Sequence, residues 1–177
     1  MTFPDAALTS ARRVRLLVLD VDGVLTDGRL YYFEGEREAK AFCTQDGAAL
    51  KMLMSTGVDV AIVTGRRSDV VRRRADELGV ELLFEGADDK GACIAELGVR
   101  TGVAGVEMAH VGDDVPDLPA FNRVGFKIAV PGAHPTVLER ADYVTTAAPG
   151  GGAVREVCQL LMVAQSTWAA ALARFDR

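Results

Sequence analysis

The chain has 177 residues, of which 49% are hydrophobic, so it can bury the core of one domain and leaves little room for a second. Its net charge of -5 disfavours non-specific binding to nucleic acid, because phosphate backbones attract clustered Lys and Arg and the basic cluster at residues 72–74 is short. No run approaches the roughly 18 apolar residues of a membrane span. We therefore expect neither a nucleic-acid nor a membrane partner.

The cysteines and the N-terminus indicate where the protein works. Cys43, Cys93 and Cys158 are widely spaced and odd in number, which favours neither a disulfide framework nor a zinc site. The N-terminal segment lacks the apolar core of a signal peptide, since Pro4 and Asp5 interrupt it. These features predict a cytoplasmic protein.

The first half of the chain alternates apolar runs with amphipathic segments. After a loose or weakly helical leader over residues 1–12, the run 14–19 predicts a strand buried on both faces that ends at Asp20. Aromatic residues around a glycine-containing polar turn predict a β-hairpin over 28–42. The next predicted elements are a helix over 46–55, a strand over 58–63 before Thr64, a helix over 68–78, a strand over 80–84 and a helix over 90–97.

The second half continues the alternation. It predicts a strand over 108–111 before an acidic segment, a short helix over 116–122, a strand over 124–130, a helix over 134–140 and an edge strand over 143–144. After a glycine loop at 150–152, one long amphipathic helix is expected over 153–173. Strands that alternate with helices predict a doubly wound, mainly parallel α/β sheet, with residues 1–177 in a single domain.

Polar side chains follow the predicted strands at the point where each strand ends. Asp20, Thr64 and Asp113 each come after an apolar run, with Asp22 and Asp114 close by in sequence. The carboxyl ends of neighbouring parallel strands meet at one crevice, so these side chains are expected together. Four carboxylates there would repel one another unless a cation lies between them, and an oxygen-only set of ligands favours Mg²⁺.

Each of these motifs is common by itself, and only their order carries information. A lone Asp-x-Asp is usually a solvated turn, Thr-Gly-Arg is ordinary turn chemistry, and an isolated lysine usually lies at the surface. Here Asp20-Val-Asp-Gly-Val-Leu-Thr26 is followed by Thr64-Gly-Arg66, then by Lys90 at a helix start, then by Gly112-Asp-Asp114. In this order and at these element ends, the segments resemble the signatures of the haloacid dehalogenase superfamily.

The resemblance implies a reaction through a covalent intermediate. Asp20 would attack phosphorus and form an aspartyl-phosphate. Asp22 would protonate the leaving oxygen and then activate the hydrolytic water. Thr64 would hydrogen-bond the phosphoryl oxygens, and Lys90 would neutralise the nucleophile and the phosphate.

The resemblance also implies a metal site. Asp20, Asp113 and the main-chain carbonyl of Asp22 would bind Mg²⁺ directly, and Asp114 would support them from behind. Asp117, three residues further along, belongs to the same acidic segment. His110, which precedes that segment on a strand, is expected to be a core residue rather than a ligand.

The spacing between the signatures leaves no room for a cap domain. The interval from Asp20 to Thr64 holds a hairpin and one helix, and the interval from Thr64 to Lys90 holds one helix and one strand. A capless site suits a macromolecular substrate or a site closed by a neighbouring subunit. The aromatic residues 31–33 would be costly to expose in a monomer, so the hairpin is predicted as an oligomer contact; the alternative is a hairpin folded on its own domain.

Further motifs over about residues 14 to 166 resemble one family, the 3-deoxy-D-manno-octulosonate 8-phosphate phosphatases. They are Asp20 to Gly28, Lys40-Ala-Phe42, Asp46-Gly47, Thr64 to Arg66, His110 to Asp114, Ala133-His-Pro135, Ala141 to Thr145 and Gly152 to Cys158. The resemblance implies release of phosphate from an acidic eight-carbon sugar on the route to lipopolysaccharide, by a tetramer whose hairpins form a central barrel. It implies substrate contacts from Asp22, Cys43, Thr44, Gln45, Asp46, Gly47, Lys51, Arg66, Arg74 and Lys90.

Three departures from the family pattern leave the substrate open. Cys43 stands where relatives usually have Asn, Lys51 stands where they have Arg, and the loop at 149–152 lacks an Arg. Lysine loses the planar fork with which arginine grips a carboxylate. The alternatives are a phosphatase of nonulosonate (sialic-acid-type) 9-phosphates, a capless protein or nucleotide phosphatase, and a non-catalytic assembly protein of the same fold.

Overall fold

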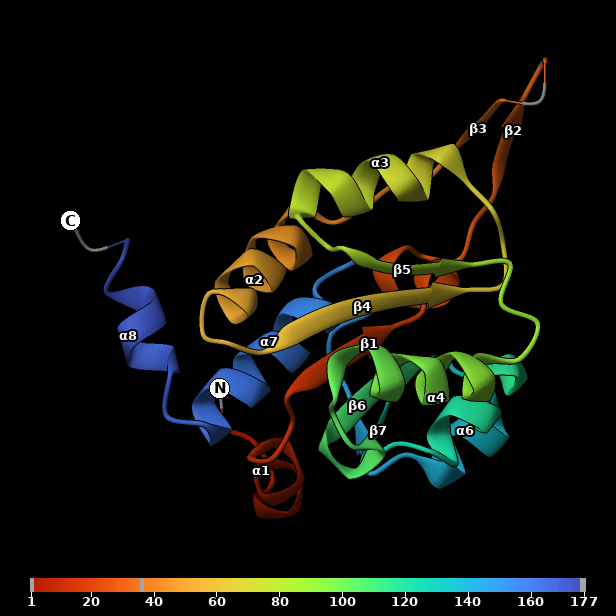
Figure 1. The fold of residues 1–177 in the computed structure, drawn as a ribbon. Helices are drawn as coiled ribbons and strands as arrows, with labels where there is room; N and C mark the ends of the chain where they lie inside the picture. Colours follow the sequence, from red (N-terminus) through yellow and green to blue (C-terminus); the bar gives the residue numbers. More distant parts are fainter. Residues whose placement is uncertain (1, 36, 176–177) are drawn as a thin grey trace.

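The computed structural model describes residues 2–35 and 37–175 (Figure 1). Its main sheet has six strands in the order β5-β4-β1-β6-β7-β8, and every neighbouring pair is parallel. The predicted doubly wound, mainly parallel α/β fold is confirmed. The strands are β1 Leu16–Leu19, β4 Asp59–Thr64, β5 Leu82–Glu85, β6 Met108–Gly112, β7 Phe126–Ala129 and β8 Tyr143–Val144.

Helices cover both faces of this sheet. They are α1 Asp5–Ala11, α2 Thr44–Met54, α3 Asp69–Leu78, α4 Lys90–Thr101, α5 Leu118–Phe121, α6 Pro135–Arg140, α7 Ala153–Ala164 and α8 Trp168–Leu172. Successive side chains of a strand point to opposite faces. In β1, Leu17 and Leu19 therefore pack with α1, α2, α3 and α7, whereas Leu16 and Val18 pack with α4 and α5.

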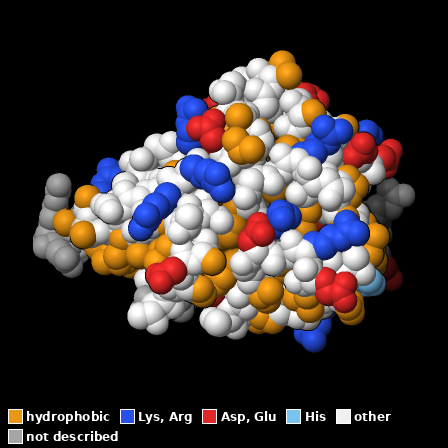
Figure 2. Space-filling model, turned by 90° about the horizontal axis from the view of Figure 1, so that it is seen from below, with side chains coloured by type: hydrophobic (Ala, Val, Ile, Leu, Met, Phe, Trp, Pro, Cys, Tyr) orange, Lys and Arg blue, Asp and Glu red, His pale blue; other side chains and the backbone are white. Residues whose placement is uncertain are grey.

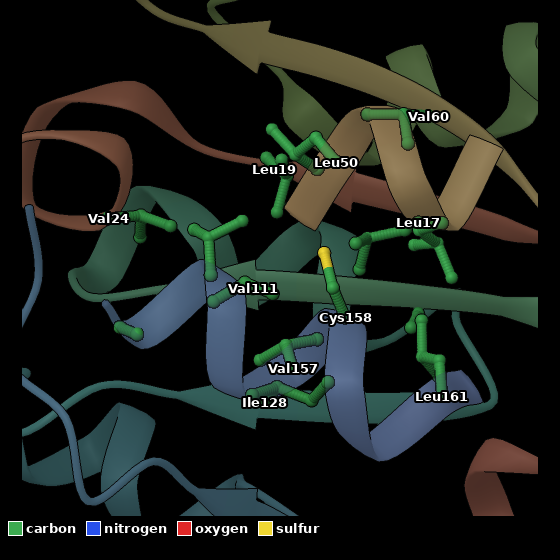
Figure 3. Close-up of a cluster of buried hydrophobic side chains, with 14 of the residues drawn as sticks. Leu17, Leu19, Val24, Leu50, Val60, Val111, Ile128, Val157, Cys158 and Leu161 are labelled. Atoms are coloured by element: carbon green, nitrogen blue, oxygen red, sulfur yellow. The ribbon is translucent and has the colours of Figure 1, made fainter. Parts of the chain in front are cut away.

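The larger core lies between the sheet, α2 and α7. Figure 3 shows Leu50 of α2 and Cys158 of α7 directed toward Leu17 and Leu19 of β1. Burial raises the pKa of the Cys158 thiol, so it stays protonated and acts as a small apolar side chain.

The predicted hairpin is present as an element separate from the main sheet. β2 Tyr31–Phe33 pairs antiparallel with β3 Arg37–Ala39, and Figure 1 shows the pair projecting from the body of the domain. Tyr31, Tyr32 and Phe33 are 44%, 65% and 58% exposed. The turn residue Glu36 lies outside the described residues. From Asp20 to Thr64 the described chain holds a helical turn, the hairpin, α2 and β4, and from Thr64 to Lys90 it holds α3 and β5, so neither interval contains a cap domain, as predicted.

The expected single helix over 153–173 is wrong. The helix ends at Ala164, Ser166 adopts a left-handed φ of 59°, and α8 starts afresh at Trp168. Side-chain contacts explain the break, because the Gln165 amide donates hydrogen bonds to the carbonyls of Ala11 and Val14 at 3.1 and 2.8 Å. The contacting residues are more than 150 positions apart, so the helical periodicity of residues 153–173 does not predict the break.

The N-terminal leader is better ordered than the sequence indicates. Residues 5–11 form α1, which packs on α7 and buries Ala7 and Ala11. None of the helices in the described part of the chain is long and apolar enough to span a membrane. On the face shown in Figure 2, Lys and Arg side chains are scattered among acidic ones instead of forming a continuous basic surface.

Glu156 of α7 fixes the loop that leads to the glycine segment. Its carboxylate accepts hydrogen bonds from the Tyr143 hydroxyl, the Thr146 amide and hydroxyl, and the Ala147 amide, at 2.6 to 2.9 Å. Burial alone would raise the pKa of Glu156, but these hydrogen bonds outweigh it and lower the pKa. Gly150 of the same loop has a φ of 62° and lies so close to the backbone of Thr26 that a side chain would collide. The loop thus supports the segment after β1.

We predict that Glu156→Gln lowers the free energy of unfolding by about 1–3 kcal/mol, because an amide cannot accept all four hydrogen bonds. Urea unfolding at neutral pH measures this. Because the pKa is lowered in the folded state, the contribution is complete above the ordinary value of 4.5 and is lost as the pH falls below it, so the variant's deficit shrinks in acid. Glu96→Gln, at an exposed i,i+4 pair with Arg100, is the control, and an equal deficit in both variants would contradict the prediction.

Candidate active site

Three neighbouring strands deliver the predicted polar residues to one edge of the sheet. Asp20 follows β1, Thr64 ends β4, and Asp113 follows β6, and β1 lies between the other two strands. Together with Lys90 from the start of α4 they line a cavity of about 210 Å³. Asp22, Arg66, Asp114 and Asp117 also line it. The crevice expected at the carboxyl ends of the strands is therefore present.

A buried lysine joins two of the acids. Lys90 Nζ lies 2.7 Å from Asp20 Oδ1 and 2.6 Å from Asp117 Oδ1, and all three side chains are less than a tenth exposed. Asp89 caps α4 by accepting hydrogen bonds from the amides of Gly91 and Ala92, which fixes the helix start that carries Lys90. Burial would lower the pKa of Lys90, but the charges of Asp20 and Asp117 outweigh it and raise the pKa. The ammonium group is therefore a permanent cation.

Asp117 uses both carboxylate oxygens to hold its neighbours. Oδ1 accepts from Lys90 and from His110 Nε2, the latter at 2.9 Å, and Oδ2 accepts from the amides of Asp113 and Asp114 at 3.0 and 3.2 Å. Burial alone would raise the pKa of Asp117, yet the contacts with His110 and Lys90 hold it well below its usual range. Asp117 thus remains ionised and orients the acidic loop, with its oxygens already engaged.

Asp113 lies close to Asp20 and Asp117 and has no Lys or Arg partner among the described residues, and neither has the more exposed Asp114. Burial and the charges of Asp20 and Asp117 raise the pKa of Asp113 to about 7. Burial also raises the pKa of Asp20, an effect that Lys90 opposes and Asp117 reinforces. Carboxylate oxygens of Asp20, Asp113 and Asp117 lie within 4.8 Å of one another. An additional cation placed at Asp20 and Asp113 would relieve this repulsion.

Glycine 23 brings the segment after β1 against Asp113. Its φ is 96°, and a Cβ atom there would lie 2.6 Å from the carboxylate carbon of Asp113. Only glycine tolerates both this backbone conformation and this approach. The donors gathered here are carboxylate oxygens with main-chain carbonyls nearby, which is the chemistry of a hard divalent cation.

Asp22 lies at the side of the cavity toward the hairpin. Its Oδ1 forms an ion pair with Lys40, and its Oδ2 lies 3.8 Å from Arg66 Nε. Arg66 in turn donates a hydrogen bond to the Tyr32 hydroxyl at 3.0 Å and lies 3.8 Å from Glu38. Thr64 is buried, and its hydroxyl accepts from the Arg66 amide at 3.4 Å.

The other predicted substrate residues lie outside the cavity of Asp20 in the described chain: Cys43, Thr44, Gln45, Asp46, Gly47, Lys51 and Arg74. They belong to α2, to the residue before it and to the facing side of α3. Arg74 lies over the Phe42 ring, 5.7 Å from its centroid, and donates to the Cys43 carbonyl at 3.5 Å. Gly47 packs directly against the Arg74 guanidinium, and Lys51 is exposed.

For Asp46, a direct contact of its carboxylate with substrate is not supported. The carboxylate is 1% exposed and Oδ1 accepts a hydrogen bond from the Arg155 amide at 2.8 Å, so the side chain ties α2 to the start of α7. Burial raises its pKa. Asp46 and Arg155 are far apart in sequence, and neither position alone signals the contact.

Sequence reasoning missed the roles of two further residues that contact acids of the cavity. Lys40 stands out in the sequence only as part of a motif, although its ammonium group forms an ion pair with Asp22. His110 is buried, as predicted for a core residue. It also contacts the Asp117 carboxylate through Nε2, which the sequence does not indicate. Their partners lie 18 and 7 residues away in other elements, so the periodicity of a single helix or strand does not pair them.

Comparison with known proteins agrees with this geometry. A family model of haloacid dehalogenase-like hydrolases matches residues 46–125. The 3-deoxy-D-manno-octulosonate 8-phosphate phosphatase KdsC of Salmonella typhi is 44% identical over 158 residues, which cover 89% of this chain and 84% of that protein. The chain belongs to the 3-deoxy-D-manno-octulosonate 8-phosphate phosphatase family. The resemblance predicted from the motifs is confirmed.

Solved structures of the phosphatase family share the whole fold. A probable YrbI family phosphatase from Pseudomonas syringae pv. phaseolica is 42% identical, with a TM-score of 0.95 over 98% of this chain and 99% of that one. The 3-deoxy-D-manno-octulosonate 8-phosphate phosphatase of Moraxella catarrhalis is 40% identical, with a TM-score of 0.95 and the same coverage. That protein was solved in complex with a magnesium ion, a phosphate ion and a KDO molecule.

We predict that a divalent cation stabilises the protein through Asp113. At about 100 times its dissociation constant, a cation adds about 2.7 kcal/mol and raises the melting temperature by roughly 5–10 °C. Asp113→Asn should lose this rise, yet melt higher than the wild type in a chelator, because one of the crowded charges is gone. Scanning calorimetry with Mg²⁺ and with chelator measures both effects.

Asp76→Asn, an exposed acid on α3, serves as the control and should keep the wild-type response. A cation response that persists in Asp113→Asn would place the cation elsewhere.

Proposed function

We propose that the protein is a Mg²⁺-dependent phosphatase that hydrolyses 3-deoxy-D-manno-octulosonate 8-phosphate to the free sugar acid and phosphate, in lipopolysaccharide precursor synthesis. The observation that carries the proposal is the cavity in which Asp20 lies beside the buried cation of Lys90, with Asp22 at its rim. The 44% identity to a phosphatase of this substrate supports the choice of sugar.

The first step transfers the phosphoryl group to Asp20. A bond forms between a carboxylate oxygen of Asp20 and phosphorus while the bond from phosphorus to the sugar oxygen breaks. Asp22 gives a proton to that leaving oxygen. Lys90 balances the charge of Asp20 from 2.7 Å, and the Thr64 hydroxyl, at the end of the neighbouring strand, can donate to a phosphoryl oxygen.

The second step releases phosphate and restores the enzyme. Asp22, now a carboxylate, accepts a proton from water as the water oxygen bonds to phosphorus. The bond between phosphorus and Asp20 breaks and regenerates the Asp20 carboxylate. Each proton that Asp22 gives in the first step is thus returned in the second.

Asp20, Asp113 and the main-chain carbonyl of Asp22 would hold Mg²⁺, with Asp114 behind them. When bound, the ion supplies positive charge opposite the phosphoryl oxygens. The donor set fits this ion, since it consists of oxygen atoms and Asp113 has no Lys or Arg partner in the described chain. Asp117 holds the loop of Asp113 in place through the main-chain amides.

Recognition of the sugar is proposed for the surface between the cavity and α2. Arg66 borders the cavity, and Lys51 and Arg74 add positive charge on α2 and α3 that suits a carboxylate in addition to a phosphate. Cys43, Thr44, Gln45 and Gly47 would shape the loop around the sugar, with Asp46 holding that loop from within the core.

A nonulosonate 9-phosphate is the second candidate substrate. The observation in its favour is Lys51, which offers a point charge instead of the planar fork of arginine and so constrains the carboxylate less. A non-catalytic assembly protein is disfavoured, because each proposed catalytic position carries a group able to act. Phosphate release from both sugar phosphates, measured side by side, ranks the two substrates.

We also propose that the protein acts in the cytoplasm as a homotetramer, without a nucleic-acid or membrane partner. The exposed aromatic side chains of the hairpin support the assembly, because exposing them all to water in a monomer is unfavourable. The scattered charges in Figure 2 and the net charge of -5 support the absence of a nucleic-acid partner.

Asp20→Asn is predicted to lower phosphate release from 3-deoxy-D-manno-octulosonate 8-phosphate by about 10³-fold or more, because an amide is a poor nucleophile. A colorimetric phosphate assay with Mg²⁺ measures the loss. Asp76→Asn should retain full activity. Equal rates for the wild type and Asp20→Asn would sink the proposed chemistry, whereas a wild type active only on the nonulosonate ester would correct the substrate alone.

Phe33→Glu is predicted to shift the tetramer to smaller species, because it places a charge on the exposed aromatic strand of the hairpin. Light scattering during size-exclusion chromatography gives the mass. Val99→Glu, which adds the same charge at a position 86% exposed on α4, is the matched control and should leave the mass unchanged. A wild-type monomer would refute the proposed assembly.

A further inference from the structure

Two cations, one from the hairpin and one from the main sheet, contact the two oxygens of the Asp22 carboxylate. Lys40, just after β3, forms an ion pair with Oδ1, and Arg66, just after β4, lies 3.8 Å from Oδ2. The Lys40 side chain has 0% exposure, whereas that of Arg66 is 42% exposed. The stronger and drier of the two contacts is therefore the one from the hairpin side.

The burial of Lys40 constrains what its ammonium group can do. A fully buried ammonium needs an anion in contact with it, and Asp22 is its acidic partner among the described residues. Lysine donates hydrogen bonds and accepts none, so the oxygen that it contacts serves only as an acceptor. Oδ1 is thereby occupied, and Oδ2 is left as the oxygen of Asp22 that can exchange a proton.

The hairpin fixes Lys40 through further contacts at its base. The Glu38 carboxylate forms a hydrogen bond with the Ser68 hydroxyl and lies 3.8 Å from Arg66, and Tyr32 accepts a hydrogen bond from the same arginine. These contacts join β2 and β3 to the segment after β4. The aromatic tip is exposed, but the base of the hairpin is bound to the rim of the cavity.

We propose that Lys40 is a positioning residue that holds Oδ1 of Asp22 and so presents Oδ2 to the leaving oxygen. Asp22 is 21% exposed in a site without a cap, and its side chain has two free torsions that would otherwise sample other rotamers. A fixed rotamer matters because proton transfer requires a distance of about 2.6–3.2 Å to the oxygen concerned. The inference rests on the role proposed for Asp22.

A purely structural role for Lys40 makes a different prediction. Loss of a structural ion pair would lower stability and slow all substrates alike. Loss of a positioned acid slows substrates according to how much their leaving oxygen needs a proton. A sugar alkoxide needs one, whereas p-nitrophenolate leaves readily without it.

The test compares an alkyl and an aryl phosphate in the variant Lys40→Met, which keeps most of the length of the unbranched side chain and removes the charge. We expect kcat/KM for 3-deoxy-D-manno-octulosonate 8-phosphate to fall by about 10- to 100-fold, and that for p-nitrophenyl phosphate by about threefold or less. kcat/KM is the suitable quantity because it reports the first transfer, in which the leaving group departs. Lys40→Arg should restore part of the loss.

Lys127→Met is the matched control, because Lys127 also pairs with an aspartate, Asp142 at 3.3 Å, but at the far edge of the sheet. Lys127→Met should leave kcat/KM for both substrates unchanged. Combining Lys40→Met with Asp22→Asn should add little to the loss from Asp22→Asn alone, since both act on one proton transfer. Melting temperatures identify variants that fail to fold. If Lys40→Met is one of them, the rates of Lys40→Arg on the two esters are compared with those of the wild type instead.

Equal losses on the alkyl and aryl esters, or losses that add fully in the double variant, would overturn the role of Lys40. A wild type that hydrolyses glucose 6-phosphate but no acidic sugar phosphate would overturn the proposed substrate instead. The ratio of alkyl to aryl activity, measured then with glucose 6-phosphate, still decides whether Lys40 positions Asp22.

Discussion

The contact of Lys90 with Asp20 and Asp117 is the interaction on which the rest of the site depends. Three charged side chains are withdrawn from water at the end of β1, at the start of α4 and after β6. Removing a partner from such a group leaves an unpaired buried charge, which costs about 3–5 kcal/mol. The arrangement is stable because Asp117 also accepts hydrogen bonds from His110 and from two main-chain amides, so both of its carboxylate oxygens have donors. The carboxylate of Asp20 is therefore held in place by a buried network of ion pairs and hydrogen bonds.

The distribution of cations within the cavity is compatible with a metal ion beside Asp113. Asp20 and Asp117 share Lys90, and Asp22 is paired with Lys40 and Arg66. Asp113 has no such partner among the described residues, and its pKa is raised to about 7. The protein thus supplies a cation for Asp20, Asp22 and Asp117, but none in the described chain for Asp113 beside Gly23 or for the exposed Asp114. A divalent ion at Asp113 would balance this charge, and it would bind more weakly when protons compete for Asp113.

The parts that the sequence could predict depend on local periodicity and on a general rule about sheets. Apolar runs marked the strands, and the convergence of parallel strand ends placed Asp20, Thr64 and Asp113 together. The parts that it could not predict depend on contacts between distant segments. Gln165 ends α7 because it reaches Ala11 and Val14, and Asp46 is withdrawn into the core because it meets the Arg155 amide. No period in the sequence encodes such pairs.

The hairpin links two proposed roles, the assembly of subunits and the acid catalysis by Asp22. Its tip exposes Phe33, and its base carries Lys40, which is buried against Asp22. A two-stranded ribbon alone is marginally stable in water. The contacts of Glu38 with Ser68 and Arg66 therefore stabilise the base of the hairpin. Subunits that pack against the tip would further restrict the ribbon, and that restriction would reach Asp22 through Lys40. If the proposed assembly forms, it would therefore help to order Asp22, which the open cavity leaves partly exposed.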